Sequence, residues 1–119
     1  MKDKITKRQA DILAKLATEM LNVDLNNEPF DQNLCSMCVI GHALSNSLLR
    51  SCKKNEPEDF LHAVDAMGLS YIHSAYLFGP MYIIEYEARE LELPVYSNTP
   101  IGAYKRIEAL LNKYGWDLV

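Results

Sequence analysis

Two cysteines and one histidine are the residues whose types and spacing most clearly suit chemistry. Segment 35–42 reads Cys-Ser-Met-Cys-Val-Ile-Gly-His. Because each residue of an α-helix turns the chain by about 100°, Cys35, Cys38 and His42 would lie within about 60° of one another on a helix. Two thiolates and an imidazole on one face suit Zn²⁺. A fourth ligand would come from Cys52, His62 or His73.

The competing interpretation treats the same cysteines as packing residues. Structural zinc sites usually hold two cysteines on a tight turn and take the other two ligands from a second recognisable pair, which this sequence lacks. Free cysteine is among the residue types most often buried. We therefore predict that Cys35 and Cys38 are small core residues and that the protein has no metal or cofactor. Zinc bound by Cys35, Cys38 and His42 stays the alternative.

Catalytic patterns are weak in this sequence. Cys38 and His42 are one helical turn apart, as a cysteine nucleophile and its base would be, but no orienting group accompanies them. The five glycines are scattered and form no phosphate-binding loop. We predict a non-enzymatic protein without catalytic residues. The alternative is an enzyme or small-molecule-binding protein with a pocket near His42, His73 and the tyrosines.

The segment that carries the cysteines is also the least charged part of the chain. Residues 34–49 contain no Asp, Glu, Lys or Arg, and apolar residues recur there at helical spacing. We predict a buried central helix at about 34–51. Its neighbours would be helices at about 6–22, 55–68, 70–78, 81–91 and 99–115, although Met81–Tyr86 also has strand-like composition. The predicted fold is all-α: a compact bundle of about five to six short helices forming a single domain over residues 1–119.

Specific residues define the ends of these helices. Thr6 and Gln9 form a capping-box pattern, with Ile5 and Ala10 placed as a hydrophobic staple. The apolar stripe that follows is predicted to end at Asn22. Further along the chain, starts are predicted at Ser70 and at Thr99-Pro100, and stops at Gly68, Gly79-Pro80, Pro94 and Gly115.

The charge balance excludes several classes of partner. Twelve Lys and Arg against sixteen Asp and Glu give a net charge of −4, which argues against nucleic acid and against an anionic membrane surface. No apolar run approaches the length of a membrane span. Because the first residues are polar and do not resemble a signal peptide, we expect a cytoplasmic protein with reduced cysteines.

Tyrosines and acidic residues are concentrated in the second half of the chain. In the purely structural interpretation, Tyr71, Tyr76, Tyr82 and Tyr86 are half-buried core residues. The solvated acidic face of the helix then contains Glu85, Glu87, Glu90 and Glu92. However, tyrosines also anchor protein–protein interfaces. We predict a protein-interaction module that binds a protein partner, either a host protein or a second copy of itself. The residues assigned to partner binding are Tyr82, Glu85, Tyr86, Arg89 and Glu90.

Segment 38–44, Cys-Val-Ile-Gly-His-Ala-Leu, resembles a motif of small helical proteins from phages, plasmids and bacterial genomes that carry Cys-x-x-Gly-Ala-Leu or a close variant. Segments 68–70, 76–78, 99–100 and 106–111 fit the same layout, whereas Cys35 and His42 depart from the simple motif. The resemblance implies a compact helical domain from a mobile element. It brings no activity and no catalytic residues, and it implies a host-directed role such as inhibiting a defence complex by binding it.

Overall fold

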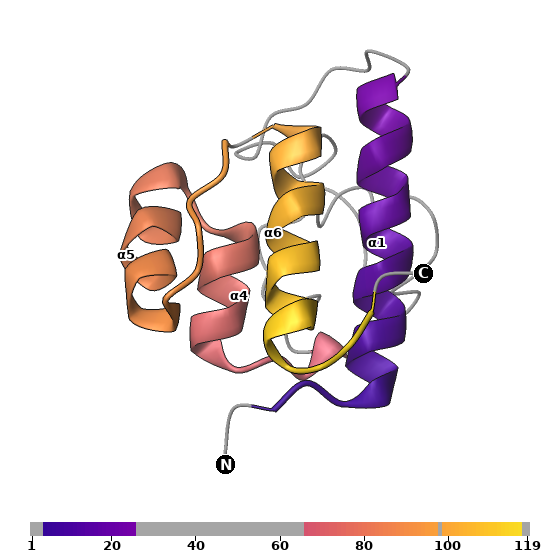
Figure 1. Cartoon of the computed structure of the whole chain (residues 1–119), viewed down its shortest axis with the longest axis horizontal. Coiled ribbons are helices and arrows are strands. Elements are labelled where there is room, and N and C mark those ends of the chain that lie inside the picture. The colour runs from indigo at the N-terminus through magenta and orange to yellow at the C-terminus, as the bar shows by residue number, and fades with distance from the viewer. Residues whose placement is uncertain (1–3, 26–65, 98, 118–119) are drawn as a thin grey trace.

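The computed structural model describes residues 4–25, 66–97 and 99–117, and the regular structure in these ranges is helical, with no strand (Figure 1). The prediction of an all-α fold is confirmed for this part of the chain. The predicted central helix at about 34–51 and most of the one at 55–68 lie outside the described residues. The helices are α1 (Lys7–Leu25), α4 (Tyr71–Phe78), α5 (Met81–Leu91) and α6 (Pro100–Lys113).

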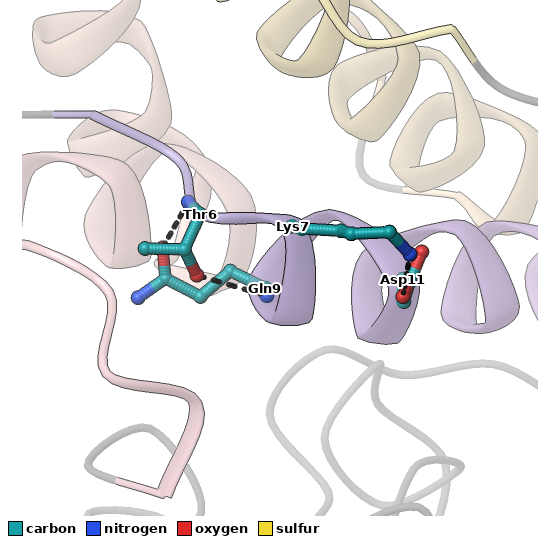
Figure 2. Close-up of polar contacts among 4 residues, drawn as sticks. All are labelled: Thr6, Lys7, Gln9 and Asp11. Atoms are coloured by element: carbon teal, nitrogen blue, oxygen red, sulfur yellow. Dashed lines mark hydrogen bonds and ion pairs between the residues drawn. The ribbon is translucent and has the colours of Figure 1, made fainter.

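The start of α1 is the capping box that the sequence predicts. The backbone N–H of Thr6 donates a hydrogen bond to Gln9 Oε1 (2.9 Å), and the backbone N–H of Gln9 donates to Thr6 Oγ1 (3.2 Å) (Figure 2). Ile5 and Ala10 are both buried in the core, as expected for a hydrophobic staple. The two hydrogen bonds satisfy backbone groups that a helix start would otherwise leave unpaired.

The other end of α1 differs from the prediction. The helix continues past Asn22 to Leu25, because the apolar stripe continues as well: Val23 follows Met20 by three residues and is buried. Asn22 is exposed on the opposite side of the helix, where a polar residue does not interrupt packing.

Helices α4 and α6 begin at their predicted caps. The hydroxyls of Ser70 and Thr99 each accept a hydrogen bond from the backbone N–H three residues along the chain, at 3.3 and 3.1 Å. Pro100 occupies the first position of α6, where its missing N–H costs nothing. Gly79 caps the end of α4, and Gly115 follows α6 in the left-handed region (φ 83°).

Residues 81–86 are helical, so the choice between helix and strand is settled. Helix α5 ends at Leu91, as the predicted range 81–91 has it, and Pro94 follows three residues later. Glu92 takes the left-handed conformation (φ 58°) that usually falls to glycine, and the N–H of Leu93 donates to the carbonyl of Ala88 (2.8 Å). These features form a Schellman-type cap that needs no proline.

Helix α6 lies between α1 and α4, and α5 packs against α4 at one edge of the described structure (Figure 1). Helices α1 and α4 run in one direction, and α5 and α6 run in the other. The indole N–H of Trp116 donates to the carbonyl of Ile5 (2.9 Å), so the segment after α6 returns to the start of α1. The core between the helices contains Leu13, Leu16, Met20, Tyr76, Leu77, Ile84, Ile107, Leu110 and Leu111, all nearly or fully inaccessible to solvent.

Candidate protein-binding surface

Helix α5 is amphipathic, and one of its sides faces solvent. Ile84, Ala88 and Leu91 recur at helical spacing and are buried. The opposite side carries the residues that the sequence assigns to partner binding. All of them are exposed, and we call them the outer face of α5: Tyr82, Glu85, Tyr86, Arg89 and Glu90.

Two aromatic rings dominate the outer face of α5. Tyr82 is 70% exposed and Tyr86 is 56% exposed, and they lie one helical turn apart. Tyr71, at the start of α4, is 77% exposed, whereas Tyr76 is buried. The interpretation of these four tyrosines as half-buried core residues is therefore wrong for three of them. Their rings leave a large apolar area in water, as rings that anchor an interface do before the partner binds.

A shallow groove shares Glu85 and Arg89 with the outer face of α5. Its volume is about 400 Å³, and its lining includes Glu85 and Arg89 of α5 together with Leu93 and Val95 of the segment that follows. Although Glu85 and Arg89 are four residues apart, they form no ion pair in the described structure, where the ion pair found joins Lys7 and Asp11 on α1. The lining of the groove thus combines two opposite charges with two aliphatic side chains.

Glu87 does not belong to the outer face of α5. The sequence groups it with Glu85, Glu90 and Glu92 on one solvated face, but Glu87 is only 6% exposed. The reason is its position: it follows Ile84 by three residues and precedes Leu91 by four, so it lies on the buried side of the helix. The outer face of α5 is consequently less acidic than the run of glutamates suggests.

A second cluster of polar groups lies inside the protein, between α4 and α6. Arg106 is fully buried. Its Nη1 donates to the carbonyl of Ser97 (2.9 Å) and its Nη2 donates to the carbonyl of Leu77 (3.2 Å). Its Nε has no hydrogen-bond partner among the described residues. A buried guanidinium held by two carbonyls is unusual, because arginine is rarely buried without a charged partner.

Tyr76 completes this cluster from α4. Its hydroxyl donates to the carbonyl of Pro94 (2.8 Å). Burial raises the pKa of Tyr76 to about 12, against the opposing effect of the Arg106 charge. Burial lowers the pKa of Arg106 to about 10. We call Tyr76, Arg106 and the carbonyls that they bind the buried polar seam.

The buried polar seam holds residues 94–97 against the body of the protein. Gly102, in the first turn of α6, strengthens this attachment: a Cβ atom there would lie 1.7 Å from the carbonyl oxygen of Ser97. Since Leu93 and Val95 also line the groove, the seam fixes one wall of the candidate surface. Arg106 itself is out of reach of any ligand and acts as a positioning residue.

Arg106 was absent from the predicted site, although the sequence contains a signal for it. It follows Ala103 by three residues and precedes Leu110 by four, and both are buried. An arginine on the apolar stripe of a helix must find partners inside the protein. The spacing indicates that Arg106 is buried, but it does not tell which distant carbonyls it binds.

His73, named from the sequence as a possible fourth zinc ligand and as part of an alternative pocket, is buried, with 1% of its surface exposed. Its Nε2 lies 2.9 Å from the hydroxyl of Tyr114, and the two rings meet edge to face at 5.0 Å. His73 lines neither of the shallow grooves found among the described residues. Burial and this contact make His73 a link between α4 and the end of α6.

The predicted metal residues Cys35, Cys38 and His42 lie outside the described residues, so the zinc hypothesis stays a prediction. Within residues 4–25, 66–97 and 99–117, no three His, Cys, Asp or Glu side chains gather as metal ligands would. None of the helices described there is long and apolar enough to cross a membrane.

Comparison of the chain with protein-family models, with curated proteins and with solved structures gives no significant match. What the chain does is therefore inferred from its own surface and its own interior.

Proposed function

We propose that the chain is a non-enzymatic protein-interaction domain that binds its partner through the outer face of α5. The observation that carries this proposal is the exposure of Tyr82 and Tyr86, one turn apart on a helix whose opposite side is fully packed. Tyrosine is among the residues most enriched at the energetic centres of protein interfaces. Its ring buries a large apolar area, and its hydroxyl binds a polar group at the rim.

The surroundings of the two rings suit an interface. The groove lined by Glu85, Arg89, Leu93 and Val95 shares two residues with the outer face of α5 and can take a partner side chain. Opposite charges at the edge of an apolar patch supply the polar rim that protein interfaces usually have. The buried polar seam fixes residues 94–97, so one wall of the groove is ordered before binding, which lowers the entropic cost of association.

The nature of the partner belongs to the proposal as well. The resemblance to small proteins of phages and plasmids favours a host protein, with inhibition of a defence complex as the consequence of binding. The self-complementary pattern of the outer face favours a second copy of the chain. We further propose that the protein acts in the cytoplasm and that residues from about 34 to 51 form the central helix of its bundle.

Site-specific photo-crosslinking tests the proposal directly. A benzophenone amino acid placed at Tyr82 samples the outer face of α5. The same amino acid placed at Lys15 samples the exposed side of α1 as a matched control. After irradiation of cells that express each protein, we expect protein adducts from position 82 and few from position 15. Mass spectrometry of the adducts then identifies the partner.

Further substitutions make the result interpretable. Replacing Tyr86 by serine in the protein that carries the crosslinker at position 82 should reduce adduct formation at least about tenfold, since one anchor of the interface is then missing. Circular dichroism checks that the helices remain. Equal yields from positions 82 and 15, or a yield that Tyr86→Ser leaves unchanged, would contradict the proposed surface.

A further inference from the structure

We infer that the partner of the outer face of α5 is a second copy of the same chain, packed against it as an antiparallel helix pair. This inference rests on the proposed function and names the partner of the same surface. It is drawn from the order of the exposed residues along α5, which is Tyr82, Glu85, Tyr86 and Arg89. Read in the two opposite directions, this order places Tyr82 of one copy at the height of the partner subunit's Arg89.

The spacing along the helix gives the register. Tyr82 and Arg89 are seven residues apart, two turns, so they lie on nearly the same line of the helix surface. A twofold axis that passes between residues 85 and 86 puts each of them about 5 Å from the axis along the helix. Tyr82 then faces the partner subunit's Arg89, and the contact occurs twice. A guanidinium over a tyrosine ring is a favourable cation–π contact.

The two flanks of the same stripe are also compatible with this register. On the Glu85 flank, the same axis brings the two Glu85 carboxylates to nearly the same height, with the partner subunit's Arg89 about one turn away, so each carboxylate comes within reach of a guanidinium that offsets the repulsion between the two acids. On the other flank, Tyr86 approaches the partner subunit's Tyr86 near the axis, where the two rings can stack. An isologous interface of this kind uses one surface patch twice.

Among the described residues, the charges needed for this pairing are not used in an ion pair. In the part that the structure describes, Glu85 and Arg89 form no ion pair with one another, despite favourable spacing. The available surface is short, because α5 has 11 residues and spans only about 16 Å. A contact of that length falls in the class of small, transient interfaces. We therefore expect a dimer that forms at roughly 100 µM and dissociates on dilution.

Two charge-reversal variants of the full chain test the register. In Arg89→Glu, residues 85 and 89 are both acidic, so two copies repel. In Glu85→Arg, both are basic, with the same result. When the two variants are mixed in equal amounts, residues 85 and 89 are both acidic in one subunit and both basic in the other, so the two subunits attract. We expect each variant alone to dissociate at least about tenfold more readily than the wild type, and the mixture to recover a dimer.

Sedimentation velocity provides the readout, with mass about twice the 13.6 kDa of the single chain as the mark of a dimer. Lys15→Glu, on the exposed side of α1, is the control that should behave as the wild type. A monomeric wild type at roughly 500 µM, or a mixture no more associated than its components, would overturn the inference. Adducts from position 82 to a different protein would then leave the proposed function standing. Absence of any adduct would end both.

Discussion

The buried polar seam and the outer face of α5 use the same residue types in opposite settings. Arg106 is fully buried and Arg89 is exposed. Tyr76 is fully buried, while Tyr82, two residues into α5, is 70% exposed. In the seam, the side chains therefore form hydrogen bonds within the protein, whereas on the outer face of α5 the same side-chain types remain accessible to a binding partner. The residue types arginine and tyrosine alone therefore do not predict whether a side chain stabilises the fold or faces solvent, because that depends on burial.

The difference arises from what each set of side chains can reach. In the seam, three carbonyl groups at Leu77, Pro94 and Ser97 accept hydrogen bonds from side chains of other elements. These contacts connect α4, α6 and the segment that follows α5. On the outer face of α5, Arg89 lines the groove together with Glu85, and no hydrogen bond holds its side chain among the described residues. One set stabilises the fold, and the other is available for association.

Replacing Arg106 or Arg89 separately by alanine should give the largest difference in stability between the seam and the outer face of α5. Arg106→Ala leaves the carbonyls of Ser97 and Leu77 without their donors and opens a cavity between α4 and α6, so we expect a loss of about 3–5 kcal/mol in the free energy of unfolding. Arg89→Ala removes an exposed side chain and should change that free energy by less than about 0.5 kcal/mol. Urea denaturation followed by circular dichroism measures both.

The stated mechanism also predicts where the damage appears. In Arg106→Ala, hydrogen exchange at residues 95–97 and in the last turn of α4 should accelerate first, because Arg106 holds the carbonyls of Ser97 and Leu77. Similar losses of stability in the two alanine variants would contradict the distinction between the seam and the outer face of α5.

The tyrosine pair gives a smaller contrast of the same kind. Tyr76→Phe removes the hydroxyl that donates to the carbonyl of Pro94 while leaving the ring in place, and we expect a loss of about 1 kcal/mol in stability. Tyr82→Phe should be nearly neutral, since its hydroxyl is exposed. Thermal unfolding of both variants, monitored side by side with the wild type, gives the comparison. A more stable Tyr76→Phe would mean that the hydroxyl is not satisfied.

What the sequence predicts well is local. The capping box of Thr6 and Gln9, the cap at Thr99 and the stop at Gly115 depend on residues within one turn of each other, and all appear where expected. The five residues assigned to partner binding also share the exposed side of α5, because helical spacing alone separates them from Ile84 and Leu91.

What the sequence does not predict depends on distant partners. Glu87 lies among acidic neighbours, but its spacing to Leu91 places it on the buried side. The donors of Arg106 meet carbonyls that lie 9 and 29 residues away, a pairing set by how α4 and α6 pack. His73 meets Tyr114 across 41 residues in the same way. The spacing of apolar residues predicts which side of a helix is buried, but it does not predict which other element packs against that side.

The buried Tyr76 also makes the stability of the protein depend on pH in the alkaline range. The pKa of Tyr76 is about 12 in the folded protein, above its ordinary value of 10.0. Between these values the unfolded chain loses the proton and the folded protein keeps it, so stability falls as the pH rises. Arg106 acts in the opposite direction over this range, because its pKa of about 10 is lowered by burial.

A comparison of variants isolates the tyrosine contribution to this pH dependence. Tyr76→Phe lacks the titrating group, so its stability deficit relative to the wild type should shrink as the pH rises from about 10 to about 12. Unfolding experiments across that range measure the deficit, and the ultraviolet absorbance of tyrosinate follows the titration itself. A deficit that stays constant would show that Tyr76 ionises alike in the folded and unfolded chains.

The smallest expected effect lies where the chain leaves the outer face of α5 and enters the segment held by the seam. Glu92 has a left-handed backbone there, at a position where glycine avoids the clash of Cβ with the backbone. Glu92→Gly should therefore raise the free energy of unfolding by about 0.5 kcal/mol, after allowance for the greater freedom of glycine in the unfolded chain. Glu90→Gly, inside α5, should lower it by about 1 kcal/mol. Because Leu93 donates to Ala88 immediately after this turn, a stabilised cap also holds the wall of the groove more firmly. Opposite signs for the two glycine variants would show that Glu92 is strained, and equal losses would mean that α5 continues through it.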